Sequence, residues 1–372
     1  MTSPDASRSP LRILVILPSW VGDVVMATPT LRLLRDAFPG AFLGALARPG
    51  IDQLLAGTTL LDEVHVERAQ GVMGPKLVAA KLRPRRYDTT LLLPNSLSSA
   101  LIARIAGIPR RLGYARDARG LLLTRTIDPP RHDGRWALCS AVDYYHNLAR
   151  HLLLPLSPVR PTPAAAPGEF LPLPPGRFME LDTTPGDEAL SDAILAKARV
   201  EFGVSGPFAL LNPGGNNPAK RWPPDRFALL AAHLTREHGL SILINGSPGE
   251  SDLVEGIASH AGVPCAPLPR LGITLGALKA LSRRARIMVT NDTGPRHIAA
   301  ALGVPLVSLF GPTDHRWTSI PTRPGAPERI LVADPSLPEG EIANDHPDRC
   351  RIERVQTEAV IGAVDEALGA RA

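Results

Sequence analysis

The chain has 372 residues, of which 44% are hydrophobic but only 4% aromatic, and a formal net charge of +5. This length and composition favour two domain-sized, aliphatic cores over a single large one. Cys139, Cys265 and Cys350 show no CxxC spacing, which argues against a zinc site or a disulfide framework and favours a reducing compartment. The first ten residues are polar, and no run approaches the roughly 20 apolar residues of a membrane span, so a soluble, cytoplasmic protein is predicted.

The positive charge is concentrated in the N-terminal part of the chain. Residues 1–160 hold 21 Lys and Arg against 12 Asp and Glu, whereas the remainder is net negative. Such a surface would attract phosphate-bearing lipid head groups, an anionic bilayer or nucleic acid, and a merely soluble basic surface is the alternative. Few aromatic residues lie between these cations, which argues against binding of single-stranded nucleic acid. The arginines in this excess include Arg83, Arg85, Arg86, Arg110, Arg111, Arg116, Arg119 and Arg125.

Apolar strands alternate with amphipathic helices in the N-terminal half, as in a doubly wound parallel sheet. Strands are predicted over 11–17, 41–47 and 89–94, and helices over 24–37 and 98–106. Gly22-Asp23 lies where the first strand turns into the first helix, and Gly22 permits close backbone approach. Asp23 is either a general base for an acceptor hydroxyl or a favourable partner of the helix dipole.

Residues 153–186 are dense in proline and are expected to form no regular element. We therefore place a first domain at 1–165, a linker at 166–186 and a second domain at 187–372. Helices are predicted over 189–202, 224–238, 250–261, 275–282 and 357–368, and strands over 208–212 and 241–245. Two such domains imply a cleft between them, and ligands commonly bind in clefts of this kind.

The loop after the strand at 208–212 combines two glycines, two adjacent cations and an aromatic residue. Gly214 and Gly215 would let the backbone wrap a diphosphate, and Lys220 or Arg221 would neutralise charge as a leaving group departs. A surface loop with incidental basic residues is the alternative. After the next strand, Glu250 is placed either to accept a hydrogen bond from a ribose hydroxyl or to cap the following helix.

In the segment RIMVTNDTGPRHIAAALGVPLVSLFGPT, residues 286–313, strands are predicted over 287–289 and 306–310, and a helix is predicted to start near Pro295. The segment therefore brings two strand ends and one helix N-terminus together. Thr293 is expected to cap the helix, and Pro295 fits its first turn. Thr293 and Gly294 offer donors to a phosphate, and Asp292 adds a carboxylate. A well-capped crossover without a ligand is the alternative. His297, one turn further, is either a site residue or a buried neutral histidine.

Four motifs in this order and spacing resemble the ADP-heptose:lipopolysaccharide heptosyltransferases, which are inverting glycosyltransferases of the GT-B fold. These motifs are PSWVGDVVMATPTLRLLR, PGGNNPAKRWPPDRFALLA, NGSPGE and NDTGPRHIAAALGVPLVSLFGPTD. The likeness covers nearly the whole chain. Residues 108–124, 142–145 and 345–355 resemble the second heptosyltransferase of the inner core in particular.

The resemblance implies an α/β, GT-B protein with two Rossmann-like domains facing across a cleft, the first taking a lipid-linked acceptor and the second a nucleotide sugar. It implies that Asp23 is the base, that Lys220 holds the diphosphate, and that the turn at 292–294 receives phosphate and sugar. The donor-binding set predicted in this way is Gly22, Gly214, Gly215, Lys220, Arg221, Glu250, Asp292, Thr293, Gly294 and His297.

The sequence shows no metal-binding cluster, and we expect no cofactor besides the substrate ADP-heptose. The expected partners are this nucleotide sugar, an anionic lipid-linked sugar acceptor and, transiently, the cytoplasmic face of the inner membrane, but no nucleic acid.

Two features depart from the family pattern. Pro295-Arg296 stand where two apolar residues usually precede the histidine, and Arg296 either adds a cation on the donor side or faces solvent. His315-Arg316-Trp317 stand where a smaller turn is common. The exact donor sugar therefore stays open, as do the acceptor, the linkage and the oligomeric state.

Two other functions compete with glycosyl transfer. One is a sugar-nucleotide epimerase or hydrolase of the same architecture, which would consume the donor without an acceptor. The other is a non-catalytic module that binds anions or nucleic acid, which would show salt-dependent polynucleotide binding.

Overall fold

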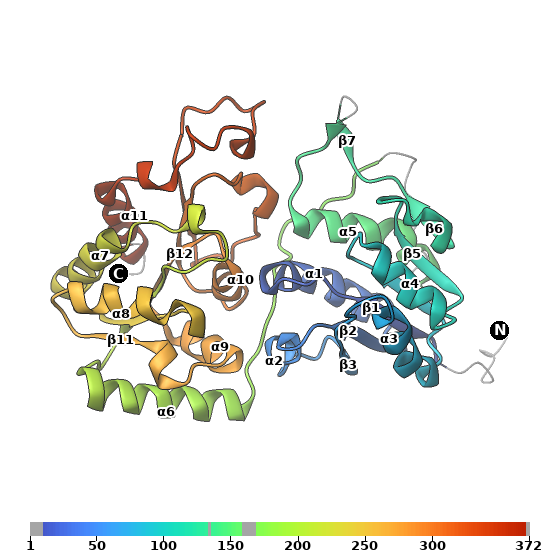
Figure 1. Ribbon diagram of the computed structural model, residues 1–372, viewed down its shortest axis with the longest axis horizontal. Coiled ribbons are helices and arrows are strands. Elements are labelled where there is room, and N and C mark those ends of the chain that lie inside the picture. Colours follow the sequence, from blue (N-terminus) through green and yellow to red (C-terminus); the bar gives the residue numbers. More distant parts are fainter. Residues whose placement is uncertain (1–9, 133–134, 158–168, 370–372) are drawn as a thin grey trace. The chain divides into compact units, whose positions relative to one another are not determined.

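The computed structural model describes residues 10–132, 135–157 and 169–369 (Figure 1). The chain forms two compact units. Unit 1 consists of the described residues up to Asp52 and of Thr58–Arg177, and unit 2 consists of Gln53–Gly57 and the described residues from Phe178 onward. Each unit contains a six-stranded sheet whose paired strands are all parallel, which confirms the predicted α/β class. No helix in these described ranges is long and apolar enough to cross a membrane.

The sheet of unit 1 has the order β3-β2-β1-β4-β5-β6. Its strands are β1 (Arg12–Ile16), β2 (Phe42–Ala47), β3 (Glu63–Val66), β4 (Thr89–Leu92), β5 (Arg110–Tyr114) and β6 (Arg125–Ile127). The helices are α1 (Val21–Ala37), α2 (Ile51–Leu55), α3 (Gly74–Leu82), α4 (Leu97–Ile105) and α5 (Ala141–Leu152). Helix α1 packs against α5, and α3 packs against α4. A short antiparallel pair, β7 (Arg131–His132) and β8 (Arg135–Trp136), lies outside the main sheet.

Helix α1 contains a proline, and its neighbour compensates for the missing backbone donor. Pro29 has no N–H with which to bond the carbonyl of Val25, four residues earlier. The hydroxyl of Thr28 donates to that carbonyl at 2.7 Å instead. Because all three residues are buried, this side-chain bond removes the cost of an unpaired carbonyl inside the unit.

The sheet of unit 2 has the order β11-β10-β9-β12-β13-β14. Its strands are β9 (Phe208–Asn212), β10 (Ser241–Ile244), β11 (Cys265–Pro267), β12 (Ile287–Asn291), β13 (Leu306–Phe310) and β14 (Glu328–Val332). The helices are α6 (Pro185–Phe202), α7 (Pro224–His238), α8 (Ser251–His260), α9 (Leu275–Arg284), α10 (Gly294–Ala301) and α11 (Thr357–Gly369). Every residue of β9, β12 and β13 is buried, as expected of central parallel strands covered on both faces. Helices α7, α8 and α11 build an apolar cluster with these strands, around the fully buried Trp222.

Most predicted elements are present with small shifts of their ends. Helix α1 begins at Val21, three residues earlier than predicted, so Gly22 and Asp23 lie inside its first turn. The start of the predicted linker, residues 166–168, lies outside the described residues. From 169 to 184 the chain forms no helix or strand, and α6 begins at Pro185. Strands β3, β5, β6 and β14 were not predicted, because several of their residues are charged or partly exposed. Strand β11 was not predicted either, because it is only three residues long and ends in a proline.

Candidate active site

The predicted donor loops of unit 2 lie at one edge of its sheet. The chain first forms β9, then adds β10 on one side of it and later β12 on the other. Ligands of open α/β sheets bind beyond the carboxyl ends of the strands where the strand order reverses in this way. Residues 213–223 follow β9, 245–250 follow β10 and 292–294 follow β12. These loops therefore extend from neighbouring strand ends at the reversal point.

Lys220 and Asp292 form an ion pair between two of these loops. Lys220 Nζ donates to Asp292 Oδ2 at 2.9 Å, and the hydroxyls of Thr313 and Thr318 lie 3.4 and 3.2 Å from the oxygens of this buried carboxylate. Burial alone would raise the pKa of Asp292, but the charges of Lys220 and Arg296 outweigh it and hold the pKa below its ordinary value. An ammonium has three N–H donors, and the pair uses one. Lys220 therefore keeps donors for an anionic ligand while Asp292 fixes its position.

Glu250 binds the loop that contains Gly214 and Gly215, here called the glycine loop, and we call this set of contacts the clamp. Its Oε1 accepts the N–H of Gly215 at 2.7 Å, and its Oε2 accepts both the N–H and the hydroxyl of Ser247 at 2.8 Å. Burial would raise the pKa of Glu250, but these hydrogen bonds lower it. A Cβ atom at Gly214 would lie 2.5 Å from Glu250 Oε1, so the loop can approach the carboxylate this closely only with glycine there.

These contacts change the roles expected of Glu250 and Gly215. Glu250 forms a capping box with Ser247, which is the alternative role predicted for it. Three of its about four acceptor positions are occupied, and one is left for a ribose hydroxyl. The N–H of Gly215 is already bonded, so it can bind a diphosphate only if Glu250 moves.

Arg221 supports the same loop. Its Nε donates to the carbonyl of Gly215 at 2.9 Å, and its Nη2 lies 3.8 Å from Glu250 Oε1. The side chain is about one-third exposed, at 34%. Arg221 is therefore primarily a brace of the loop, whereas Lys220 is held at the reversal point by Asp292.

A network of buried asparagines connects the strand ends, and sequence reasoning missed it. Asn212 ends β9, Asn291 ends β12 and Asn245 follows β10. Asn245 Nδ2 donates to Asn212 Oδ1 at 2.6 Å, and Asn212 Nδ2 donates to the hydroxyls of Thr290 and Thr293 at 3.1 and 2.8 Å. Asn291 Nδ2 donates to the carbonyls of residues 213 and 214 at 2.7 and 3.1 Å. An asparagine at the end of each apolar strand was the available sequence signal.

Thr293 occupies the N-cap position of α10, but its side chain does not cap the helix. Its hydroxyl accepts from Asn212 Nδ2 at 2.8 Å and lies 3.3 Å from the carbonyl of Asn291. The prediction of a side-chain cap was therefore wrong, because Asn212 binds that oxygen. Pro295 fits the first turn as predicted. Since no side-chain oxygen caps this end of α10, its dipole remains available to an anion that approaches Gly294.

Arg296 is fully buried and does not face solvent. It forms a bidentate pair with Glu328 of β14, with Nε to Oε1 at 2.6 Å and Nη2 to Oε2 at 3.0 Å. Its Nη1 donates to the carbonyl of Thr318 at 2.8 Å and lies 3.8 Å from Asp292 Oδ1. Arg296 thus joins α10, β14 and the segment after β13, and places positive charge beside Asp292.

His297 is buried, with 3% of its surface exposed. Burial and the charge of Arg296 lower the pKa of His297 to about 3, so the imidazole is neutral at physiological pH. This agrees with the alternative of a buried neutral histidine. His297 therefore cannot act as a cationic phosphate ligand.

The unusual segment after β13 is fixed by its own ion pair. Arg316 binds Asp314 through Nε at 2.8 Å and Nη2 at 2.7 Å, and it also donates to the carbonyls of Glu339 and Glu341. Burial would raise the pKa of Asp314, but the bonds from Arg316 help to lower it to about 2. A cavity of about 260 Å³ lies here and includes Thr313 in its lining. The segment at 315–317 therefore anchors the chain beside the predicted site.

In unit 1, Gly22 and Asp23 follow β1 at the corresponding edge of the sheet, where the strand order reverses between β1 and β4. Tyr145 of α5 hydrogen-bonds with Asp23, and its pKa is raised well above the ordinary value by burial and by the charge of Asp23. The neutral phenol is a donor to the carboxylate, so it fixes the orientation of the Asp23 side chain. This is an arrangement suited to a positioned general base.

A second polar cluster of unit 1 lies beyond β4 and was not predicted. Arg119 is fully buried and donates to Asn95 Oδ1 at 3.0 Å, to the carbonyl of Tyr114 at 3.2 Å and to the carbonyl of Pro94. Asn95 Nδ2 donates in turn to the hydroxyl of Tyr144 at 3.1 Å. Burial lowers the pKa of Arg119 to about 10. The cluster orders the chain after β4.

The basic surface predicted for unit 1 is smaller than the sequence suggested. Arg111 and Arg119 are buried and bond backbone carbonyls. Arg116 is partly buried. Exposed positions are held by Arg83, Arg85, Arg86, Arg110 and Arg125.

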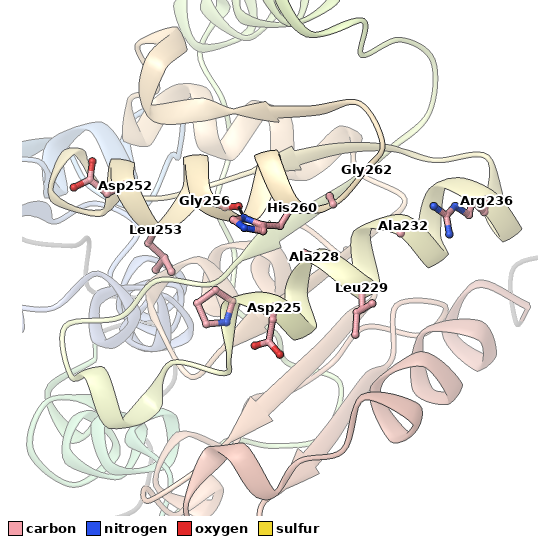
Figure 2. Close-up of a pocket in the computed structure, with 12 residues that line it drawn as sticks. Asp225, Ala228, Leu229, Ala232, Arg236, Asp252, Leu253, Gly256, His260 and Gly262 are labelled. Atoms are coloured by element: carbon pink, nitrogen blue, oxygen red, sulfur yellow. Dashed lines mark hydrogen bonds between the residues drawn. The ribbon is translucent and has the colours of Figure 1, made fainter.

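A larger hollow of unit 2 lies away from these loops. Its volume is about 710 Å³, and it lies between α7 and α8, with Asp225, Leu229 and His260 in its lining (Figure 2). None of its lining residues belongs to the predicted donor-binding set. The strand-end loops therefore form the candidate site, and this cavity is separate from it.

Comparison with known proteins agrees with this geometry. Residues 77–333 match the model of glycosyltransferase family 9 (heptosyltransferase). Lipopolysaccharide heptosyltransferase 2 of Salmonella typhimurium is 29% identical, over 90% of this chain and 93% of its own length. Lipooligosaccharide heptosyltransferase 2 of Haemophilus ducreyi is 32% identical, over 83% of this chain and 85% of its own length. The structure of Escherichia coli ADP-heptose lipopolysaccharide heptosyltransferase II matches with a TM-score of 0.75 and 26% identity, covering 96% of this chain and 98% of that one, which confirms the GT-B architecture. The chain therefore belongs to glycosyltransferase family 9, the heptosyltransferases.

Proposed function

We propose that the protein transfers a heptose from ADP-heptose to a lipopolysaccharide inner-core acceptor, with inversion at the anomeric carbon. The observation that carries this proposal is the Lys220–Asp292 pair, at 2.9 Å, on the edge of the sheet where a nucleotide sugar is expected. Family membership favours heptose as the transferred sugar. Relatives named heptosyltransferase 2 favour an acceptor that already carries one heptose.

The proposed reaction is a single displacement. Asp23 takes the proton of an acceptor hydroxyl, whose oxygen attacks the anomeric carbon while the bond from that carbon to the diphosphate breaks. Lys220 and the N-terminus of α10 stabilise the charge that develops on ADP. Donors aimed at developing charge are typically worth about 3–4 kcal/mol each.

The contacts within unit 2 support different tasks for its acidic residues. Asp292 bonds Lys220 and is buried, so we assign it to positioning that lysine. Glu250 keeps one acceptor position, which suits a ribose hydroxyl next to the glycine loop. Thr293 and Gly294 lie at the uncapped start of α10, where a phosphate would be received.

We also propose that the protein acts in the cytoplasm, in transient contact with the inner membrane. Five exposed arginines of unit 1 support this, because anionic head groups attract exposed cations, although Arg85 is already paired with Glu63. The same cations would help to attract an anionic, lipid-linked acceptor to unit 1.

In the central experiment the full chain is incubated with ADP-heptose and either a heptose-free or a mono-heptosylated lipid acceptor. Mass spectrometry then gives the masses of the products. We expect a mass increase of one heptose on the mono-heptosylated acceptor. Donor consumption without an acceptor product would indicate the hydrolase or epimerase. Polynucleotide binding without turnover would indicate the binding module.

Replacing the proposed leaving-group ligand tests the donor side. Lys220→Ala is expected to weaken ADP binding and to lower turnover together, because the cation contacts the diphosphate in both the bound and the reacting state. Calorimetric ADP titration and steady-state kinetics measure the two effects. Lys197→Ala is the matched control, since Lys197 is exposed on α6. Unchanged binding and turnover in Lys220→Ala would remove Lys220 from the mechanism.

Replacing the proposed base tests the acceptor side. Asp23→Asn keeps the size of the side chain but removes the proton acceptor, so we expect turnover to be abolished and ADP affinity to be nearly unchanged. Asp36→Asn, an exposed position on the same helix, should behave like the parent protein. Activity retained by Asp23→Asn would contradict the assignment.

A further inference from the structure

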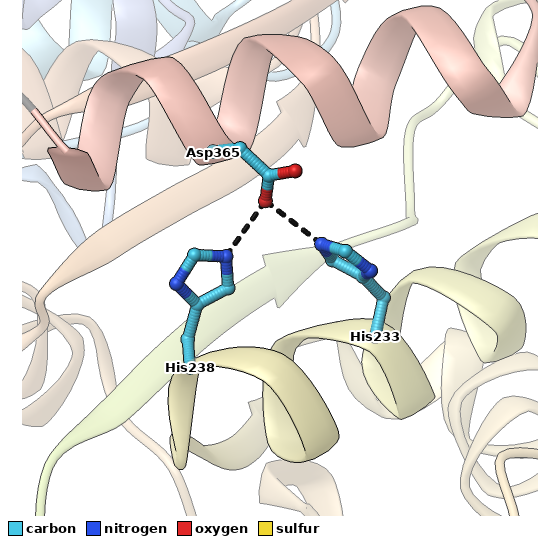
Figure 3. A group of neighbouring side chains, drawn as sticks. All are labelled: His233, His238 and Asp365. Carbon is cyan, nitrogen blue, oxygen red and sulfur yellow. Dashed lines mark hydrogen bonds and ion pairs between the residues drawn. The ribbon is translucent and has the colours of Figure 1, made fainter.

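Two histidines and one aspartate converge on the surface of unit 2 (Figure 3). His233 and His238 lie on α7, and Asp365 lies on α11. Their Nε2 atoms lie 2.8 and 2.7 Å from the same carboxylate oxygen, Asp365 Oδ1. One potential ligand atom from each residue lies within 4.8 Å of the other two. The three groups therefore already point at a common point between the helices.

The two histidines do not lie on one face of α7, because a separation of five residues corresponds to roughly 140° around a helix, and their rings approach Asp365 from different sides. His238 is the last residue of the helix. Gly239 follows in the left-handed region, with φ of 62°, and ends α7 there. The two rings lie with centroids 5.6 Å apart and planes at 67°, so they are not stacked and both present an edge to Asp365.

The chemistry of this group suits a borderline divalent cation. Imidazole nitrogen and carboxylate oxygen are zinc ligands at about 2.0–2.2 Å, and tetrahedral geometry then separates neighbouring ligands by about 3.3 Å. The two distances from Nε2 to Asp365 Oδ1, 2.8 and 2.7 Å, would lengthen by about 0.5 Å to reach that spacing. The carboxylate of Asp365 supplies negative charge at this point, which favours a cation. The ring proton moves to Nδ1 on binding, and each Nε2 becomes a ligand.

Solvent access completes the argument. The side chains of His233, His238 and Asp365 are 20%, 24% and 45% exposed. A cation can therefore enter without unfolding, and a water molecule can fill a fourth position. By contrast, none of the predicted donor-binding residues belongs to α7 or α11.

We propose that His233, His238 and Asp365 form a metal site for Zn²⁺ or a similar borderline cation, which ties the C-terminal helix α11 to α7. The site is structural and takes no part in the transfer reaction. Mg²⁺ and Ca²⁺ are excluded as natural occupants because they prefer oxygen ligands. The competing explanation is a metal-free clamp in which both rings donate to Asp365.

Zinc titration separates the two explanations. The full chain, made without a histidine tag and freed of metal with a chelator, is titrated with Zn²⁺ against a chromophoric chelator. We expect about one bound equivalent, an unchanged result in excess Mg²⁺, and a rise in melting temperature with Zn²⁺. Co²⁺ should give the visible absorption typical of a four-coordinate ion.

Three variants make the test specific. Asp365→Asn keeps a hydrogen-bond acceptor for the clamp but lacks the anionic ligand, and His233→Ala removes one imidazole. Both should lose the bound equivalent and the zinc-dependent rise in melting temperature. His260→Ala is the matched control, because His260 also ends a helix, α8, and should bind like the parent. No binding by the parent at millimolar Zn²⁺, or binding that survives in both ligand variants, would overturn the proposal.

Discussion

The buried pair between Arg296 and Glu328 allows a quantitative prediction. Arg296 is 0% and Glu328 4% exposed at the side chain. Glu328→Gln would leave the guanidinium buried without its bidentate carboxylate, and breaking such a pair costs about 3–5 kcal/mol. Asp292 lies 3.8 Å from Arg296 and compensates in part. We therefore expect a loss of stability near the lower end of this range, about 3 kcal/mol. This corresponds to a roughly 150-fold increase in the equilibrium constant for local unfolding.

Hydrogen exchange measured by mass spectrometry is the suitable assay, because global unfolding of a two-unit chain is not a single two-state transition. Exchange should accelerate in peptides that contain β13 and β14. The matched control is Glu366→Gln. Glu366 lies 3.5 Å from Arg329, the neighbour of Glu328, but is 68% exposed. Such a surface pair is worth about 0–1 kcal/mol.

A double variant tests whether the unpaired buried charge causes the loss of stability in Glu328→Gln. Arg296→Met combined with Glu328→Leu removes both charges, so it should recover much of the stability lost in Glu328→Gln. Equal exchange in Glu328→Gln and Glu366→Gln would refute the claim that the uncompensated buried charge is costly. A double variant less stable than Glu328→Gln would refute it as well.

Two further predictions concern the loops and helix α10. Gly214→Ala places a Cβ atom 2.5 Å from Glu250 Oε1, so it should displace the clamp and weaken ADP binding about tenfold in calorimetric titration. In Gly256→Ala the added Cβ atom has no neighbour within 4 Å, so ADP binding should be unchanged. His297 has a pKa of about 3 in the folded protein against 6.5 ordinarily, so the unfolded chain binds its proton first as the pH falls. Stability should therefore decline between about pH 6.5 and 3 by up to about 1.4 kcal/mol per pH unit from this group, and His297→Gln should reduce that slope in denaturant titrations. Equal slopes would contradict the assignment.

The central elements of both sheets were predictable from the sequence because their residues are apolar throughout. Strand β9 and helix α7 have the predicted bounds, and β13 does too. Edge strands were not predictable in this way. Strand β14 begins with a glutamate and an arginine, and its register depends on pairing with β13.

The candidate site was predictable as a set of loops but not as a set of contacts. The sequence placed Lys220, Glu250 and Asp292 after neighbouring strands, which parallel topology brings to one edge. It could not show that Glu250 bonds Gly215, or that Asn212 binds the hydroxyl of Thr293, because these partners are 35 and 81 residues apart. Arg296 was ambiguous for the same reason, since its partner Glu328 lies 32 residues away.

The asparagine network between β9, β10 and β12 has a consequence for the thermodynamics of binding. Asn212, Asn245 and Asn291 hold the strand ends and the glycine loop through hydrogen bonds that exist without a ligand. Backbone entropy that a flexible loop would lose on binding is therefore already lost when the chain folds. A nucleotide that binds there orders only its own bonds and the few side chains that rearrange around it.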